Sequence, residues 1–178
     1  MEPGATPTSR TGSKGFTTIE LMVVLAVMAL MSGLVVVSMG PALREAKLRT
    51  GCRIVASALV YARSYAVTHR TITQVILDKP AGTVAVFCLA TDEHGEAALQ
   101  PVLTQPGRRH KLPEGIRIVD VHKPGVEEEE DFVSFSELGQ SEEAVVVVEG
   151  VNGRNQTVTV DAVTGRCAVG SERENERR

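Results

Sequence analysis

The chain has 178 residues, of which 43% are hydrophobic and 3% aromatic, and its formal net charge at pH 7 is −3. That length allows one modest domain together with an anchoring segment. A mildly acidic chain with no tryptophan argues against nucleic-acid binding, because such proteins rely on basic patches and aromatic stacking surfaces.

The first 15 residues, MEPGATPTSRTGSKG, are rich in proline, glycine, serine and threonine, and we predict that they form an unstructured leader. Arg10 and Lys14 lie in this leader, and the next basic residue is Arg44. Positive charge on the leader side of an apolar segment predicts a cytoplasmic N-terminus. Lys47 and Arg49 weaken this contrast, but the sequence still favours a C-terminal domain on the far side of the membrane.

Residues 16–40 contain one apolar run, in which only Ser32, Gly33 and Ser38 interrupt the apolar side chains between Leu21 and Met39. In a helix these 19 residues measure about 28 Å, which matches the ~30 Å core of a bilayer. A cleavable secretory signal has a shorter apolar centre, of roughly 7 to 15 residues, followed by a small-residue cleavage site. We therefore predict that residues 16–40 form a retained transmembrane helix.

Glu20 is the one charged residue between Phe16 and Arg44. A carboxylate in the apolar part of a membrane helix costs about 2.5 to 3.5 kcal/mol, so it usually has a partner. One interpretation is that Glu20 lies at the helix N-terminus, where the helix dipole favours an anion and headgroup water is close. The other is that a cation from elsewhere pairs with it.

The string KGFTTIELMVVL, residues 14–25, resembles the class III signal of type IV pilins and of the pseudopilins of type II secretion. The resemblance implies that a membrane-embedded prepilin peptidase cleaves between Gly15 and Phe16 on the cytoplasmic side and methylates the new amine of Phe16. It also implies that the carboxylate of Glu20 pairs with the Phe16 amine of a neighbouring subunit during filament assembly. The order of charged leader, glycine, aromatic residue, glutamate and long apolar helix makes this motif specific.

The helical pattern resumes after Gly40 and is predicted to continue through residues 41–70. Pro41 is expected to bend or loosen the helix, because proline lacks an amide donor and its ring collides with the preceding turn. An apolar stripe at spacings of four and three indicates an amphipathic helix that packs on a sheet. The stripe consists of Leu48, Cys52, Val55, Leu59, Ala62 and Ala66, and the opposite face carries Lys47, Arg49, Arg53, Ser57 and Ser64.

Residues 71–170 are rich in β-branched residues and turn signals, which predicts a β-rich globular domain. Strands are expected at 71–77, 83–90, 115–121 and 166–169, with two more on either side of Asn152-Gly153. Pro80 and Gly82 supply the first turn, and Asn152-Gly153 favours a tight hairpin. The alternation in 115–121 is expected to group Ile116, Ile118 and Asp120 against Arg117, Val119 and Val121. Strands after one long helix predict an α+β fold, with the amphipathic half of the helix across an antiparallel sheet.

Residues 135–170 resemble the C-terminal signature of the GspH/FimT group of pilin-like proteins, and residues 56–78 resemble its helix end and first strand, while residues 91–131 match little of it. The resemblance implies a pilin-like fold and a minor pseudopilin of a type II secretion system that is not an enzyme. It places the chain in the bacterial inner membrane by a single pass, with a periplasmic C-terminal domain that joins a periplasmic pseudopilus. The implied partners are the prepilin peptidase, the major and other minor pseudopilins, the inner-membrane assembly platform and a cytoplasmic ATPase. The alternative is a FimT-like minor type IV pilin involved in pilus assembly or DNA uptake.

The remaining polar motifs predict no catalysis, metal or cofactor. The four histidines are dispersed, and the acidic run from Glu127 to Asp131 lacks the glycine turn of a calcium loop and is interpreted as a solvated loop. The basic cluster GRRHK, residues 107–111, is interpreted as an exposed loop, and residues 171–178 as a flexible tail. Three cysteines allow at most one internal bridge, with Cys88 and Cys167 as the candidate pair. The preferred alternative is that all three, Cys52 included, are buried free thiols.

Overall fold

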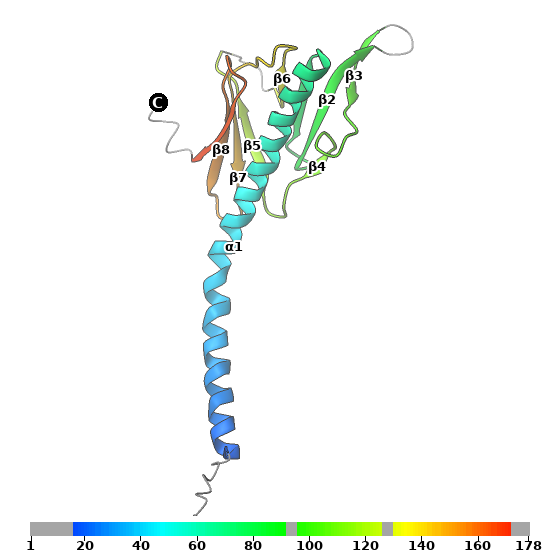
Figure 1. Cartoon of the computed structure of the whole chain (residues 1–178). Coiled ribbons are helices and arrows are strands. Elements are labelled where there is room, and N and C mark those ends of the chain that lie inside the picture. Colours follow the sequence, from blue (N-terminus) through cyan, green and yellow to red (C-terminus); the bar gives the residue numbers. More distant parts are fainter. Residues whose placement is uncertain (1–15, 92–95, 126–129, 172–178) are drawn as a thin grey trace, which may run out of the picture. The chain divides into compact units, whose positions relative to one another are not determined.

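The computed structural model describes residues 16–91, 96–125 and 130–171, and for residues 33–39 and 171 it describes the backbone alone. The chain divides into two units, residues 1–40 and residues 41–178, and one helix, α1 (Thr18–His69), contributes to both. Nine strands follow it in the described residues (Figure 1). They are β1 (Thr73–Asp78), β2 (Thr83–Thr91), β3 (Ala97–Pro101), β4 (His110–Lys111), β5 (Arg117–His122), β6 (Phe132–Phe135), β7 (Ala144–Glu149), β8 (Asn155–Val160) and β9 (Cys167–Ser171).

The C-terminal end of α1 is fixed by a backbone motif. Arg70 adopts a left-handed conformation with φ of 49°, and the N–H of Thr71 donates a hydrogen bond to the carbonyl of Ala66 at 3.1 Å. This is the pattern of a Schellman motif, which satisfies a carbonyl that the last helical turn leaves free. The helix therefore ends at His69, and β1 begins at Thr73 rather than at residue 71 as the sequence suggested.

The strands of the unit 41–178 form two antiparallel sheets instead of the single sheet expected. One sheet has the order β3-β2-β1-β6, with β4 also paired to β2, and the other has the order β5-β7-β8-β9. The consecutive strands β5, β6 and β7 thus alternate between the sheets, which local periodicity cannot reveal. In Figure 1 the helical residues 41–69 lie across the place where the two sheets meet. The architecture is α+β, as predicted.

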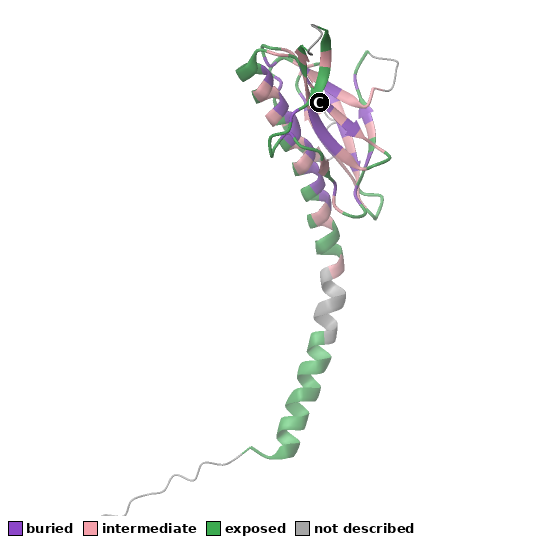
Figure 2. Cartoon of the chain, turned by 90° about the vertical axis from the view of Figure 1, so that its right-hand side faces the viewer, coloured by how far each residue is buried: buried purple, intermediate pink, exposed green. Residues whose placement is uncertain are grey.

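The predicted apolar stripe of α1 forms the centre of the core. All six of its residues are buried, and Figure 2 shows the buried side of the helix turned toward the strands. Alternate residues of β1 and β7 face the same core, as period-two strands require. Thr73 is buried among them, and its hydroxyl donates to the carbonyl of Ala62 at 3.0 Å. A Cβ on Gly51 would come within 2.7 Å of Ile116 Cγ2, so only glycine allows this close approach of helix and loop.

The alternation predicted for β5 is wrong in its second half. The pairing of β5 with β7 shifts register between Ile118 and Asp120. Such a β-bulge inserts one unpaired residue, and the residues beyond it exchange faces. Val121 is consequently buried and Val119 exposed, whereas Asp120 is half-buried and accepts a hydrogen bond from the Val121 N–H at 2.8 Å.

Asn152-Gly153 lies between two paired strands, as expected, but the turn is longer than a tight hairpin. Glu149 pairs with Asn155, so five residues connect β7 and β8. The N–H of Gly150 donates to the carbonyl of Arg154 at 2.9 Å, and Gly153 takes a φ of 66°. The turn between β1 and β2 lies where it was predicted, and the paired residues Asp78 and Thr83 flank it.

Three described strands, β3, β4 and β6, were not predicted. Four of the five residues of β3 are exposed, so the strand carries no alternating pattern. β4 has two residues and β6 has four, which are too short for a periodic signal. Each is recognisable only from its pairing with β2 or β1.

The stripe yields a direct test of the core. Leu59 is fully buried, and we expect Leu59→Ala to lower the free energy of unfolding by about 2 to 5 kcal/mol, because it removes buried methyl groups and leaves a cavity. The neighbouring Val60 is 54% exposed, and Val60→Ala should change this free energy by less than about 0.5 kcal/mol. Urea denaturation of the detergent-solubilised chain measures both, and equal losses in the two variants would contradict the assigned helix face.

Candidate assembly site

The first turn of α1 holds the residues that the sequence singled out. Thr17 stands just before the helix, where its hydroxyl accepts a hydrogen bond from the Glu20 N–H at 3.3 Å. Its carbonyl accepts hydrogen bonds from the N–H groups of Glu20 at 3.1 Å and Leu21 at 3.2 Å. Thr-x-x-Glu is the spacing of a capping box, and a carboxylate there is favoured by the helix dipole. Local structure thus gives Glu20 a place at the helix N-terminus.

The two residues of the expected cleavage site differ in what the structure describes. Gly15 lies outside the described residues, and Phe16 is the first residue inside them. Phe16 is 79% exposed, and the side chain of Glu20 is exposed as well.

The segment that follows exposes its apolar surface on every side. Each side chain from Phe16 to Ser32 is exposed (Figure 2), unlike an amphipathic helix, which buries one face. Eleven of these side chains are large and apolar: Phe16, Ile19, Leu21, Met22, Val23, Val24, Leu25, Val27, Met28, Leu30 and Met31. Leaving them in water costs on the order of 10 to 20 kcal/mol, so the segment is stabilised by an apolar environment that the described residues of the chain do not supply.

One further observation bears on the prediction that residues 16–40 form a transmembrane helix. Among the residues whose side chains are described, no helix is both long and apolar enough to cross a membrane. The predicted span includes residues 33–39, whose side chains lie outside that description.

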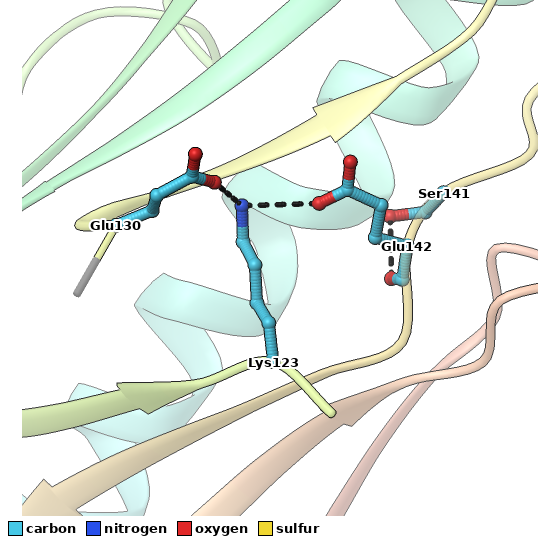
Figure 3. Close-up of polar contacts among 4 residues, drawn as sticks. All are labelled: Lys123, Glu130, Ser141 and Glu142. Carbon is cyan, nitrogen blue, oxygen red and sulfur yellow. Dashed lines mark hydrogen bonds and ion pairs between the residues drawn. The ribbon is translucent and has the colours of Figure 1, made fainter. Parts of the chain in front are cut away.

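Lys123 forms a charged cluster that the sequence did not predict (Figure 3). Its side chain is 3% exposed, and its Nζ lies 2.5 Å from Glu130 Oε2, 3.1 Å from Glu142 Oε2 and 4.2 Å from the centroid of the Phe132 ring. Because Lys123 follows β5 of one sheet and Phe132 begins β6 of the other, these contacts join the two sheets.

Ion pairs correct the interpretation of the acidic run as a solvated loop for its last two residues, Glu130 and Asp131. Residues 126–129 lie outside the described residues, but Glu130 pairs with Lys123, and Asp131 lies 2.8 Å from Lys79 Nζ. The basic partners come from other segments of the chain, so composition alone could not show them. The available signal was a lysine at the end of a predicted strand, a few residues before a run of acids.

The basic segment 107–111 borders an apolar groove of about 620 Å³. It is an exposed loop only at Arg108 and Arg109, because Gly107 is buried and His110–Lys111 form β4. The groove is lined by Ala85, Val86, Phe87, Pro101, Val102, Leu103, Gly107, Arg108 and Arg109. None of these lining residues is a nucleophile or an acid–base group of the usual catalytic types. Across the described part of the chain, no group of three or more histidine, cysteine or acidic side chains is placed to hold a metal ion.

The three cysteines are free thiols, as preferred, but only Cys52 is buried, whereas Cys88 and Cys167 are half-buried. Cys88 in β2 and Cys167 in β9 belong to different sheets and form no bridge. Burial raises the pKa of Cys52 from 9.0 to about 11 and that of Cys167 to about 11. A thiol with so high a pKa is protonated and unreactive at neutral pH. Between about pH 9 and about pH 11 these two thiols lose their protons in the unfolded chain but keep them in the folded chain. The free energy of unfolding therefore falls as the pH rises from about 9 to about 11.

The fold is shared with proteins of known structure. No protein-family model and no curated protein matches the chain in sequence. A crystal structure of the minor pseudopilin EpsH from the type II secretion system of Vibrio cholerae matches 72% of this chain and 96% of its own, with 13% identity and a TM-score of 0.58. The solution structure of Escherichia coli GspH matches 72% and 91%, with 10% identity and a TM-score of 0.55. The type IV minor pilin FimU of Pseudomonas aeruginosa matches 72% and 90%, with 16% identity and a TM-score of 0.51. At these identities the likeness shows the fold, and the predicted pilin-like fold is confirmed.

The thiols provide a second test. In denaturant without reductant, we expect iodoacetamide to add to all three cysteines, whereas a bridge between Cys88 and Cys167 would leave one site for alkylation. In the folded chain at pH 7.5, Cys52 and Cys167 should react about 100-fold more slowly than after unfolding, because a rise in pKa from 9.0 to about 11 reduces the thiolate fraction by that factor. Intact mass and peptide mapping over time measure both quantities.

Proposed function

We propose that the chain is a minor pseudopilin of a type II secretion system. In this proposal prepilin peptidase cuts it after Gly15, and the mature chain joins a short periplasmic pseudopilus that drives export of folded proteins across the outer membrane. The observation that carries the proposal is a capped helical segment, Phe16–Ser32, with no buried face, in a chain whose domain has the fold of minor pseudopilins.

The exposed segment supports both stages of this life cycle. Before assembly, residues 16–40 lie in the inner membrane as a single pass, and the domain lies in the periplasm. During assembly the apolar side chains leave lipid and pack against the corresponding helices of neighbouring subunits. Each stage supplies the apolar environment that the described side chains lack within their own chain.

Glu20 gives the assembly step its specificity. The carboxylate stands in the first turn of α1, four residues after the proposed new N-terminus at Phe16. In the filament it pairs with the methylated Phe16 amine of a neighbouring subunit, which removes the penalty of an unpaired charge among apolar helices. The capping role and the pairing role are compatible, because the capping residue Thr17 contacts the backbone of Glu20 and leaves its side chain exposed.

The proposal assigns the chain an assembly role without catalysis, and hence no cofactor or resident metal. Its partners are the prepilin peptidase, the major and other minor pseudopilins, the inner-membrane assembly platform and the cytoplasmic ATPase that drives it. The described charged cluster around Lys123 stabilises the domain, and the raised pKa values of Cys52 and Cys167 keep these thiols inert.

A FimT-like minor pilin of a type IV pilus is the second candidate. The similarity to FimU favours it, and so do the exposed Arg108 and Arg109 beside the apolar groove, which suit an anionic partner such as DNA. The gene neighbourhood separates the candidates, because a secretion cluster carries an outer-membrane secretin together with sister pseudopilins.

Cleavage is tested at Gly15. We expect Gly15→Ala to block processing and to leave a precursor heavier by the 15-residue leader, because the peptidase must fit the residue before the scissile bond. Intact mass and N-terminal sequencing of the membrane-extracted chain, from cells with and without the peptidase, measure this. Gly40→Ala is the matched control, since a Cβ at Gly40 has nothing within 4 Å, and it should be processed normally. A mature Phe16 N-terminus in the Gly15→Ala variant, or in cells without the peptidase, would contradict the cleavage proposal.

The role of Glu20 is tested by separating charge from capping. Glutamine can also occupy the third position of a capping box, so Glu20→Gln keeps the cap and removes the charge. We expect this variant to be cleaved and inserted normally but to enter filaments at least tenfold less than the native chain, as measured by shearing and quantitative immunoblotting. Thr17→Ala removes the capping hydroxyl, at about 1 kcal/mol of helix stability, and keeps the charge. If Glu20→Gln assembles normally while Thr17→Ala fails, Glu20 acts through the helix cap alone.

A further inference from the structure

Basic side chains from three distant segments gather at one end of the unit 41–178, where α1 enters it. The basal cluster consists of Arg44, Lys47 and Arg49 of α1, Arg117 at the start of β5 and Arg154 in the turn between β7 and β8. Figure 1 shows the β7–β8 turn beside this part of the helix. In agreement, Arg44 Nη1 donates to Asn152 Oδ1 at 3.0 Å, and Arg154 Nη1 lies 3.7 Å from Glu45 Oε2. The sequence showed the contiguous group at 107–111 and the basic residues of the helix, but not that Arg117 and Arg154 join the latter.

The acidic side chains at this end do not neutralise the cluster. Glu45 is shared by Arg49, at 2.6 Å, and Arg154, at 3.7 Å. Glu149 pairs with Arg117 at 2.8 Å. Glu114 is exposed in the adjoining turn, which packs closely enough that a Cβ on Gly115 would lie 2.3 Å from Val151 Cγ2. Five basic residues therefore stand against three acidic ones, in a chain whose net charge is −3.

Arg44 and Lys47 hold the uncompensated charge. They lie three residues apart on α1, which places them on one side of the helix. The hydrogen-bond partner of Arg44 is the neutral amide of Asn152, and among the described residues no carboxylate lies within ion-pair distance of Arg44 or Lys47. The amide contact holds the Arg44 guanidinium in place and leaves its charge available.

The length of the chain keeps these two residues close to the bilayer. Arg44 follows Met39, the last residue of the apolar run, by five residues, which span at most about 18 Å even when fully extended. The headgroup layer is roughly 5 to 8 Å thick on each side of the hydrocarbon core. Long basic side chains also reach toward headgroups while their stems lie along apolar surface.

We propose that Arg44 and Lys47 bind the phosphate-bearing headgroups of anionic lipids on the surface of the bilayer that faces the domain. The inference rests on the proposed membrane anchor, and it assigns a ligand to charges that the assembly role does not use. The other basic residues of the basal cluster raise the local potential, and Glu45 orients two of them. Contact with lipid holds the base of the domain at the surface until the helix leaves the membrane for the filament.

The test measures lipid preference around the full mature chain in a phosphatidylcholine bilayer. Spin-labelled phosphatidylglycerol and spin-labelled phosphatidylcholine are compared by the immobilised fraction that each shows next to the protein. We expect the native chain to prefer phosphatidylglycerol by roughly fivefold to thirtyfold, the range that corresponds to one or two basic residues near an anionic surface. The preference should fall toward one in the variant Arg44→Gln/Lys47→Gln, and also in 1 M NaCl, where the screening length is about 3 Å.

A matched variant, Arg108→Gln/Arg109→Gln, removes the same charge from the exposed loop beside the groove and should keep the preference. Equal preference in the native chain and in Arg44→Gln/Lys47→Gln overturns the proposal, as does equal loss in both variants, which would reflect net charge alone. Competition by inorganic phosphate, beyond that of chloride at the same ionic strength, overturns it in favour of a free-phosphate site. Urea midpoints confirm that both variants are folded.

Carbonate extraction separates this proposal from the functional one. A chain that carbonate releases from membranes is not anchored, and the proposed function fails together with the lipid site. A chain that stays in the membrane without any lipid preference overturns the lipid site alone.

Discussion

The side chains from Phe16 to Ser32 have no apolar partner among the described residues, and the rest of the described structure is organised around that constraint. Eleven large apolar side chains between Phe16 and Met31 are exposed, at a cost on the order of 10 to 20 kcal/mol in water. A domain is usually stable by only about 5 to 15 kcal/mol, so its own folding cannot compensate for that exposure. Placing Glu20 in an apolar setting costs about 2.5 to 3.5 kcal/mol, which is much less. Under the proposed function, the apolar run therefore decides where the helix lies, and the proposed pairing of Glu20 selects its neighbour there.

The second half of the same helix meets the opposite situation. Its stripe from Leu48 to Ala66 is buried against two sheets, and the helix approaches them closely at Gly51. The chain moves from one sheet to the other and back through β5, β6 and β7. The buried Lys123 joins the two sheets by binding Glu130 and Glu142. One helix thus contains a segment that needs other molecules and a segment that needs only its own domain. The two segments differ because apolar side chains lie on every side of the helix in the first and form a single stripe in the second.

Features that depend on local periodicity could be predicted from the sequence, and features that depend on pairing could not. The stripe, the turn between β1 and β2 and the paired strands around Asn152 are encoded in neighbouring residues, and the structure has them where they were expected. The division into two sheets, the bulge after Ile118 and the contacts of Lys123 arise from segments that meet only in the folded chain. At the candidate site, the motif around Glu20 was visible in sequence because all its parts lie within one helical turn and its leader. The basal cluster was not, because Arg117 and Arg154 join α1 from far along the chain.

The basic residues at the base of the domain and the apolar helix contribute different free energies to membrane binding. They therefore have different roles in the proposed function. Two basic residues near anionic headgroups contribute about 1 kcal/mol each, whereas the apolar helix contributes on the order of 10 to 20 kcal/mol to retention in lipid. The headgroup contacts therefore orient the domain and add little to anchoring. In the proposed function, extraction into a filament becomes favourable only when helix packing replaces lipid almost completely. The lost headgroup contacts, about 2 kcal/mol in total, are then comparable with the roughly 2.5 to 3.5 kcal/mol that an unpaired Glu20 costs. In the proposed function, the pairing of Glu20 must offset these lost headgroup contacts. Once apolar burial is nearly equal in lipid and filament, that pairing decides between them.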